Sequence, residues 1–484
     1  MAHAHQAQLS GFPATLLGRI LEGVCATIPV HLPLSQADPR RNLTLVCKDW
    51  RDVVQSTPAL WANIYFSRPF SPSSILGPRP LLAHFNACIK HSAKSLLTIR
   101  FDMALNGWAF SIVDTIIIPH ISRIKTLSCP IYGNAEVYRF LTIHEGQFGA
   151  LETLDICLIN TLNNPFSVFP HDVRQQFTVL RHAPRLCNVT VRILNNLHPL
   201  HLQLPFSQLR TLDLGATAIV PRLSVKILRS APLIEDLFVY IRFQTQDEPR
   251  RALSKSKITL HNLKTIRLRL YYPSRDGRLF STLSFPALEH AWIELYDQFQ
   301  VWDLPIYTQL LRASSNSLKV LHFSDFFPGP KHHALRYRYA LGTHYMLENF
   351  LVLFQNIEKL RLPLGITVYT QTLDKIAKCA LLPFLYALEI GTVNGIHVLS
   401  MVQHRLTHIL NSPLGLPGPS TSVETSSATS RPVAIQFLYM IVPQYGNNAY
   451  DTAELVEKVQ TLRSLGIRCW IDCSKNIPLP LRKK

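Results

Sequence analysis

The chain of 484 residues has no run of about 18 uncharged apolar residues, which excludes a membrane-spanning helix. Its first ten residues contain no lysine or arginine, so they do not have the pattern of a signal peptide. The nine cysteines are an odd number and are scattered, which argues against a disulfide framework. We therefore expect an intracellular protein of the cytoplasm or the nucleus.

Acidic residues are scarce, because 31 aspartates and glutamates stand against 49 lysines and arginines, a net charge of +18. Such an excess favours nucleic acid, an anionic membrane or an acidic protein as partner, and by itself does not distinguish them. The basic residues are dispersed, with no run of five and no known nucleic-acid motif. A nucleic-acid partner is therefore the less favoured expectation.

Motifs that carry chemistry are also missing. The sequence has no phosphate-binding Gly-x-x-x-x-Gly-Lys, no Gly-x-Gly-x-x-Gly, no Gly-x-Ser-x-Gly and no His-Glu-x-x-His. Cys469 and Cys473 lack the further ligands that a zinc site needs, and His332-His333 lack nearby acids or thiols. We expect no enzyme activity, no metal and no other cofactor.

The N-terminal region predicts a small helical module. After Pro13, which suits a first helical turn, apolar residues at 16, 17, 20, 21 and 24 form one stripe. A proline-broken loop follows at 29–39, and a second helical stripe runs through 42–54. The sequence Pro58-x-Leu60-Trp61 ends the module.

These residues resemble an F-box. The likeness rests on Phe12-Pro13, on Val46-Cys47-Lys48-x-Trp50-Arg51 and on Pro58-x-Leu60-Trp61, in that order, and is greatest with the F-box-like domains of mushroom-forming fungi. The resemblance implies that a Skp adaptor binds this module. The implied contact residues are Phe12, Pro13, Leu16, Leu17, Ile20, Leu21, Leu43, Val46 and Trp50. The alternative is that this stripe is only the core of a helical bundle.

A motif of the form apolar-x-x-apolar-x-apolar recurs after the module, at intervals of 23 to 39 residues. The copies begin at Leu96, Ile124, Leu151, Leu186, Leu209, Ile234, Leu263, Leu288, Leu318, Ile357 and Leu385. Apolar residues at helical spacing precede Pro184 and Pro232, so we expect units of helix, proline and strand. One unit cannot bury its own faces, so neighbouring units would stack into a curved parallel sheet.

This array resembles the irregular leucine-rich repeats that follow F-boxes, and the alternative is a generic α/β domain. The predicted class is α/β, a helical F-box-like module followed by an irregular leucine-rich-repeat solenoid. The expected parts are a tail at 1–11, the module at 12–66, a connecting helix or linker at 67–94, the repeat array at 95–411, a flexible Ser/Pro-rich loop at 412–432, and a strand–helix–strand cap with its tail at 433–484.

Side chains alternate along a strand, so the residues between the apolar positions would share the concave face of the array. These are Asp155, Asp213, Phe238, Tyr240, Arg267, Arg269, Tyr271, Trp292, Glu294, Tyr296, His322 and Arg361. Aromatic residues and arginine are enriched in binding hot spots, so those from Phe238 to Arg361 predict a target-binding surface. We expect Arg267 and Arg269 to bind a carboxylate or phosphate.

The F-box resemblance implies a substrate-recognition subunit of a Skp–cullin–F-box ubiquitin ligase. The Skp adaptor would connect it to the cullin-RING ligase, and the array would hold a target protein. One alternative is a scaffold whose module only packs on the array. Another is a basic repeat protein that binds nucleic acid, and an enzyme is the least favoured.

Overall fold

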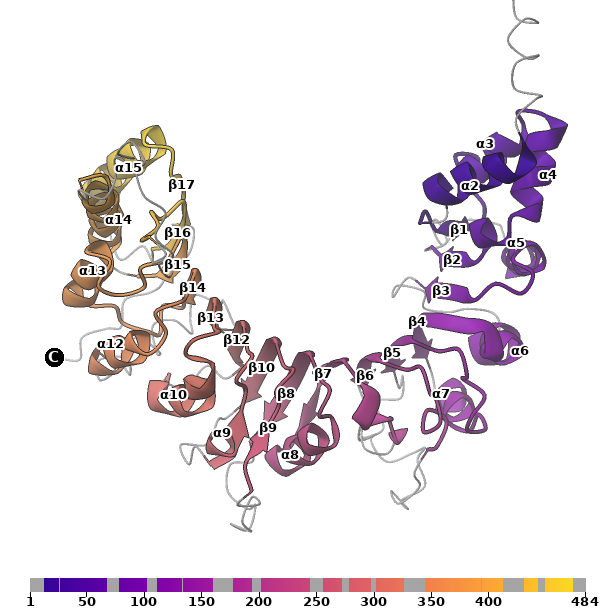
Figure 1. Ribbon diagram of the computed structural model, residues 1–484, viewed down its shortest axis with the longest axis horizontal. Coiled ribbons are helices and arrows are strands. Elements are labelled where there is room, and N and C mark those ends of the chain that lie inside the picture. The colour runs from indigo at the N-terminus through magenta and orange to yellow at the C-terminus, as the bar shows by residue number, and fades with distance from the viewer. Residues whose placement is uncertain are drawn as a thin grey trace, which may run out of the picture. The chain divides into compact units, whose positions relative to one another are not determined.

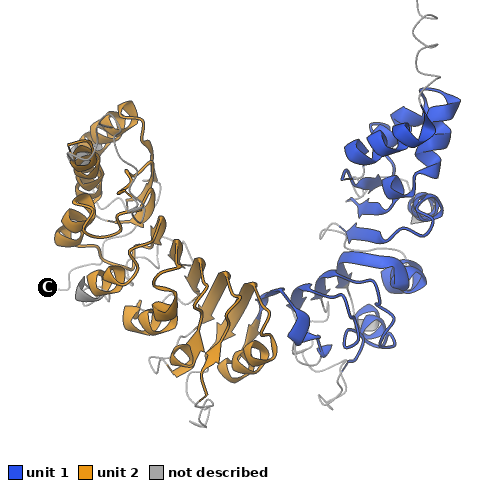
Figure 2. Ribbon diagram, in the orientation of Figure 1, with its two compact units in different colours: residues 1–217 blue, residues 218–484 orange. Residues whose placement is uncertain are grey.

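In this computed structural model, fifteen strands form a parallel sheet in chain order, with helices between them (Figure 1). The fold is therefore α/β, as predicted. The structure describes residues 13–472 except 26, 68–77, 102–110, 133, 160–176, 194–201, 244–255, 272–277, 297–301, 326–343, 393, 412–430 and 443–448. The chain divides into two compact units, residues 1–217 and 218–484 (Figure 2).

The first unit begins with a helical module whose elements lie together at its N-terminal end (Figure 1). They are α2 (Ala14–Cys25), β1 (Val30–Leu32), α3 (Pro39–Thr44), α4 (Lys48–Ser56), η1 (Pro58–Trp61) and β2 (Asn63–Phe66). Leu17 and Leu21 of α2 are buried, and Gly18 lies beside Val53 and Thr57 where α2 packs on α4. A Cβ at position 18 would lie 3.6 Å from Thr57 and 3.9 Å from Val53, at ordinary van der Waals distance.

Two strands of the sheet lie inside the segment predicted to be a helical module, for which no strand was expected. β1 pairs in parallel with β2, and β2 pairs with β3 (Leu97–Phe101), the first strand of the repeat motif. Val30, Leu32, Ile64 and Phe66 are buried on one face. The sheet therefore begins within the module. Strands of three and four residues have too little period-two pattern to be recognised in a proline-rich sequence.

The second predicted helix, over 42–54, is two helices in the structure, α3 and α4. They are separated by a turn at Leu45–Cys47, in which Cys47 is fully extended at φ −159°. The guanidinium Nε of Arg51 donates to the carbonyl of Thr44 at 3.0 Å, which occupies an acceptor at the end of α3. The break places Leu45 and Val46 in a turn and not on a helix face.

The rest of the first unit alternates strands with helices or short helical turns. Its elements are α5 (Pro78–His91), β3, η2 (Val113–Ile117), α6 (Ile118–His120), η3 (Ile121–Arg123), β4 (Ile124–Tyr132), α7 (Asn134–Leu141), β5 (Thr153–Ile159), β6 (Asn188–Ile193), η5 (Phe206–Gln208) and β7 (Thr211–Ile219). The pairings from β3 to β7 are all parallel.

The second unit continues the same alternation. Its elements are α8 (Pro221–Ser230), β8 (Asp236–Arg242), β9 (Ile258–Thr259), β10 (Thr265–Tyr271), α9 (Arg278–Ser281), β11 (Leu283–Ser284), β12 (His290–Leu295), α10 (Leu304–Leu311), η6 (Arg312–Ser314), β13 (Val320–Asp325), α12 (His344–Val352), β14 (Lys359–Leu362), α13 (Thr370–Ala377), β15 (Ala387–Gly391), α14 (Gly395–Leu410), β16 (Phe437–Ile441), α15 (Ala449–Ser464) and β17 (Arg468–Asp472). β9 and β11 form a separate two-stranded sheet.

The eleven copies of the motif coincide with eleven strands, from β3 to β15 without β9 and β11. In β8, Leu237, Val239 and Ile241 are buried, while the residues between them reach the other face. The apolar positions face the helices, which in this unit line one side of the sheet (Figure 1). The predicted strand–helix–strand end is also present, and its strands β16 and β17 extend the sheet.

One predicted helix is absent from the part of its segment that the structure describes. The helix expected before Pro232 is α8, but before Pro184 residues 177–183 contain no helix, and residues 179–182 form turns. Arg181 and Ala183 donate to carbonyls three residues earlier, which closes single turns without a continuing helix. The start of that segment, the Ser/Pro-rich loop, the N-terminal tail, His332-His333 and Cys473 lie outside the described residues.

A buried arginine joins three segments near the C-terminal end of the second unit. Arg405 of α14 donates to the carbonyls of Ile376, Leu382, Pro383 and Val433 at 2.7–3.0 Å. Burial lowers the pKa of its guanidinium. The carbonyls of Ile376, Leu382 and Pro383 also accept from backbone amides, so the guanidinium is a second donor to each of them. Among the described residues, no helix is both long and apolar enough to cross a bilayer.

Candidate functional site

An apolar stripe of helix α2 remains exposed. Leu16, Ile20 and Val24 are 46, 45 and 61% exposed and follow one another at four-residue spacing. The turn between α3 and α4 adds two more exposed side chains, Leu45 at 70% and Val46 at 48%. These five residues are called the apolar surface of the module. Exposed apolar residues gathered in a small module are typical of a protein-binding site.

The other residues predicted to bind a Skp adaptor lie elsewhere. Leu17 and Leu21 are buried in the core of the module, because they occupy the side of α2 that faces α4, so they are not contact residues. Pro13 is exposed, Leu43 is half-buried, and Phe12 lies outside the described residues. Trp50 is half-buried, and its indole Nε1 is buried without a hydrogen-bond partner among the described residues.

In the second unit, strand register aligns predicted target-binding residues across the sheet. Phe238 pairs with Arg267, Arg267 with Trp292, Trp292 with His322, and His322 with Arg361. We call these five residues the cross-strand row. One comes from each of the strands β8, β10, β12, β13 and β14, so neighbouring members are about 4.8 Å apart along the sheet.

A second line of residues runs beside the row, formed by Tyr240, Arg269 and Glu294. The ring of Tyr296 lies 5.3 Å from that of Tyr240 and 6.0 Å from that of Tyr271. Burial raises the pKa of Tyr240 to about 12, so its hydroxyl stays protonated. The structure thus brings all ten predicted target-binding residues to one face of one sheet.

Glu294 is the carboxylate that organises this face. It accepts from Nε of Arg267 and from Nε of Arg269, both at 3.1 Å, and only 11% of its side chain is exposed. Arg269 also lies over the rings of Phe238 and Tyr296 at 5.2 and 5.8 Å. The predicted joint grip of Arg267 and Arg269 on an external anion is therefore corrected, because both already hold an internal carboxylate.

A similar pair lies at the other end of the row. Nε of Arg361 forms an ion pair with Oε1 of Glu389 on β15 at 3.2 Å. Burial raises the pKa of Glu389, and Arg361 opposes that rise. The outer parts of Arg267 and Arg361 remain accessible, with 49 and 40% of their side chains exposed.

His322 lies between these arginines, with its ring edge-to-face against Trp292 at 5.7 Å. Burial, together with the positive charges of Arg361, Lys359 and Arg267, lowers the pKa of His322 to about 4. The ring is therefore neutral at physiological pH. The direction of the charge effect also indicates a positive potential at the centre of the row.

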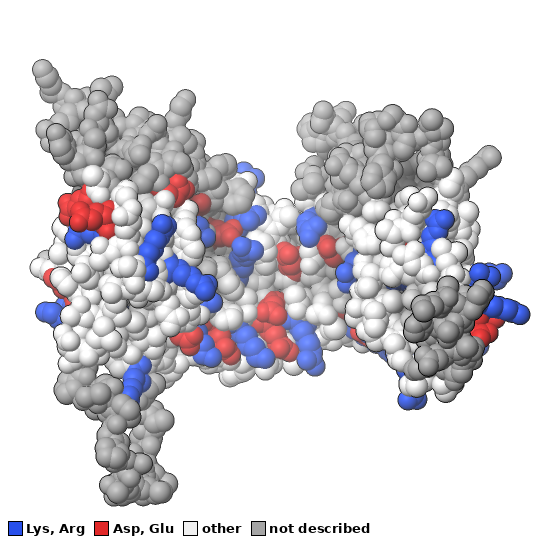
Figure 3. Space-filling view, turned by 90° about the horizontal axis from the view of Figure 1, so that it is seen from above, with Lys and Arg blue, Asp and Glu red and all other residues white. Residues whose placement is uncertain are grey.

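Basic and acidic side chains are interspersed over the molecule in the view from above, without a continuous basic field (Figure 3). In the first unit the corresponding exposed face carries Asp155 and Asp213. Asp155 accepts from Ser128 at 3.0 Å and pairs with Arg192 at 3.4 Å, while Asp213 accepts from the amide of Gly215. Both carboxylates therefore already make contacts within the chain.

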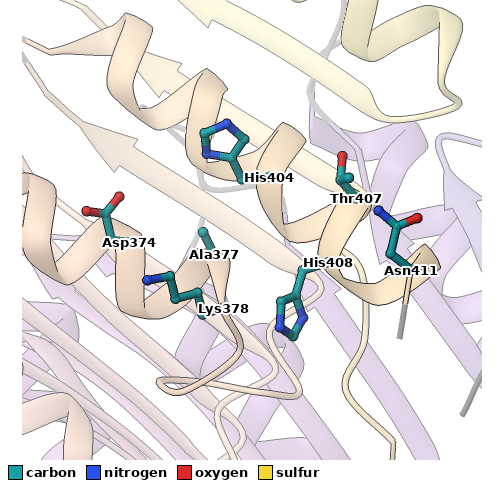
Figure 4. A pocket seen from close by; sticks show the side chains of 7 residues that line it. All are labelled: Asp374, Ala377, Lys378, His404, Thr407, His408 and Asn411. Atoms are coloured by element: carbon teal, nitrogen blue, oxygen red, sulfur yellow. The ribbon is translucent and has the colours of Figure 1, made fainter. Parts of the chain in front are cut away.

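A groove of about 520 Å³ lies between α13 and α14. His404 and His408 come from α14 and Asp374 from α13, and the side chains that line the groove do not converge on a common point (Figure 4). Within the described part of the chain, no group of three or more His, Cys, Asp or Glu side chains is arranged to hold a metal ion.

The sequence analysis missed residues that continue the exposed face. Glu389 occupies the same motif position as Arg361 and was detectable from that spacing. Tyr439 on β16 and Trp470 on β17 extend the alignment, and Tyr439 was detectable because Ile435-x-x-Leu438-x-Met440 is a further copy of the motif. Lys359 lies at the start of β14 and was missed because it precedes the first apolar position within that strand.

Comparison of this chain with known protein families and with curated proteins gave no match.

Proposed function

We propose that this chain is a substrate-recognition subunit of a Skp–cullin–F-box ubiquitin ligase. Its N-terminal module binds a Skp-type adaptor, and the exposed face of its sheet holds a target protein. In this proposal the chain binds and positions the target, and other subunits carry out the ubiquitin transfer. Holding the target near those subunits raises its effective concentration.

The observation that carries this proposal is the apolar surface of the module. Leu16, Ile20 and Val24 form a stripe that neither the core of the module nor the rest of the described chain covers. A stripe of this kind on an amphipathic helix is typical of a helix that packs against a partner. The F-box resemblance supplies the identity of that partner.

The cross-strand row supports the second half of the proposal. It combines tryptophan, arginine and other aromatic side chains on one face, the residue types that dominate protein-binding hot spots. The alternation of Arg267, Glu294, Arg361 and Glu389 suits a protein better than nucleic acid, because each carboxylate would repel a continuous phosphate backbone.

Co-purification with a Skp-type adaptor from a mushroom-forming fungus tests the proposal. We expect the wild-type chain to retain the adaptor and the double variant Leu16→Glu/Ile20→Glu to lose it. Both side chains are about half exposed, so charging them changes the surface while leaving the core of the module intact.

The matched control is Leu233→Glu in the second unit, where the leucine is 49% exposed. This variant introduces one such negative charge at a similar exposure and is expected to retain the adaptor. Failure of the wild-type chain to bind the adaptor, or equal binding by the double variant, would remove the ligase proposal.

A further inference from the structure

The cross-strand row has an order of side chains that suggests a specific ligand. Arg267, Trp292, His322 and Arg361 follow one another on adjacent strands, so the two arginines enclose an aromatic centre. Three strand spacings separate the arginines, which corresponds to about 14 Å along the sheet.

Each of these arginines forms an ion pair through the Nε atom of its guanidinium. Nε of Arg267 is held by Glu294, and Nε of Arg361 is held by Glu389. A guanidinium has five N–H donors in a rigid plane, so an ion pair through Nε orients the terminal nitrogens without using all of them. Arg267 also lies over Phe238 at 5.0 Å, which further restricts its side chain.

The charge balance of the face favours an anion. Arg242, Arg267, Arg269, Lys359 and Arg361 accompany three carboxylates, Asp236, Glu294 and Glu389, on this face of the described strands β8 to β15. Glu294 and Glu389 are already paired with arginine. The cations thus outnumber the carboxylates by two, so an additional carboxylate would meet a net positive charge.

We propose that the cross-strand row binds an extended acidic segment of the target protein, with acidic residues at positions i and i+4 against Arg267 and Arg361 and an apolar residue at i+2 over Trp292 and His322. This inference rests on the proposed function in taking the bound protein to be a target of the ligase.

The spacing of the row supports an extended segment. Four residues of extended chain span about 13–14 Å, and positions i, i+2 and i+4 point to the same side. The order acidic, apolar, acidic thus matches the order cationic, aromatic, cationic on the sheet. The lowered pKa of His322 fits this assignment, because burial and the nearby cations disfavour a positive charge on the ring. An anionic ligand is favoured by the same cations.

Fluorescence anisotropy with the full chain tests the proposal, using a labelled peptide that contains Glu-Ser-Leu-Ser-Glu. We expect saturable binding that Arg267→Met and Arg361→Met each weaken about tenfold or more, because each removes charge-assisted hydrogen bonds. The matched control Arg222→Met removes an exposed arginine from α8 and is expected to leave binding unchanged.

Two further probes check charge and spacing. A peptide with lysines in place of the glutamates, and one with the glutamates adjacent, are both expected to bind about tenfold more weakly or not at all. Equal binding of all three peptides, or equal binding by the three arginine variants, would overturn the proposal. Binding of a single-stranded oligonucleotide but not of the acidic peptide would replace it with a nucleic-acid surface.

A second measurement needs no substitution. The ring-proton signals of His322, followed by nuclear magnetic resonance, are expected to shift when the peptide binds, because the apolar residue at i+2 covers the ring. Unchanged signals at saturating peptide contradict the proposed position of the ligand. The adaptor plays no part in these measurements, so their failure leaves adaptor binding, tested separately, unaffected.

Discussion

Arg40 is the residue whose loss we expect to damage the N-terminal module most. Its side chain is 1% exposed and lies among α2, α3 and η1. Nη1 pairs with Asp38 at 3.1 Å, Nε donates to the carbonyl of Leu60 at 2.7 Å, and Nη2 donates to the carbonyls of Cys25 and Ile28. One guanidinium thus joins the end of α2 to two other elements.

Arg40→Met removes the cation but keeps most of the apolar volume. Asp38, with 4% of its side chain exposed, would remain as a buried carboxylate without its partner. Removing one member of a buried ion pair costs about 3–5 kcal/mol, and the freed carbonyls act in the same direction. A loss of this size is a large fraction of the stability of a small domain.

Hydrogen exchange of the amides in α2, α3 and η1 measures this effect, because it reports local opening in a chain of two units. We expect exchange to become faster by about two to three orders of magnitude in Arg40→Met, since every 1.4 kcal/mol is a factor of ten. Adaptor binding is expected to fall with it, although Arg40 is buried away from the solvent.

Two variants make the test specific. Arg41→Met alters the adjacent, exposed arginine and is expected to change exchange little. Arg40→Met/Asp38→Leu removes the stranded carboxylate as well and is expected to recover part of the lost protection. If Arg40→Met behaved like Arg41→Met, the guanidinium would not be the element that joins these helices.

Two further predictions concern stability. The pKa of His322 is about 4 in the folded protein and 6.5 ordinarily. The neutral ring therefore contributes fully to the free energy of unfolding above pH 6.5, and this contribution is lost as the pH falls towards 4. For this half-buried ring we expect the free energy of unfolding, measured by urea titration, to fall by about 1–2 kcal/mol over this pH range, and we expect no such fall in His322→Asn. Gly391→Ala would place a Cβ 2.6 Å from the backbone nitrogen of Leu364 and should lower the melting temperature. A Cβ in Gly23→Ala meets nothing within 4 Å on α2, so this variant should raise helix stability by about 0.5–1 kcal/mol. Equal effects of the two alanines would refute the steric argument.

The repeat strands were predictable because their signal is local. An apolar residue at every second position identifies a strand with one buried face, and the eleven motif copies all form such strands. The same alternation indicates which side chains face away from the helices, so the ten residues of the target face could be selected by spacing alone. Helix α8 and the ending of β16, α15 and β17 were found for the same reason.

The features that the sequence did not indicate depend on contacts between residues far apart in the chain. The ion pairs of Glu294 with Arg267 and Arg269 join neighbouring strands, and no pattern within either strand indicates that the arginines already pair with a carboxylate. The break between α3 and α4, which exposes Leu45 and Val46, interrupts a regular helical stripe. Arg40 and Arg405 look like ordinary surface arginines in the sequence, but each is buried against carbonyls from other segments. Periodicity records only which face of an element is apolar, whereas pairing of charges and burial of polar groups depend on the elements packed against it.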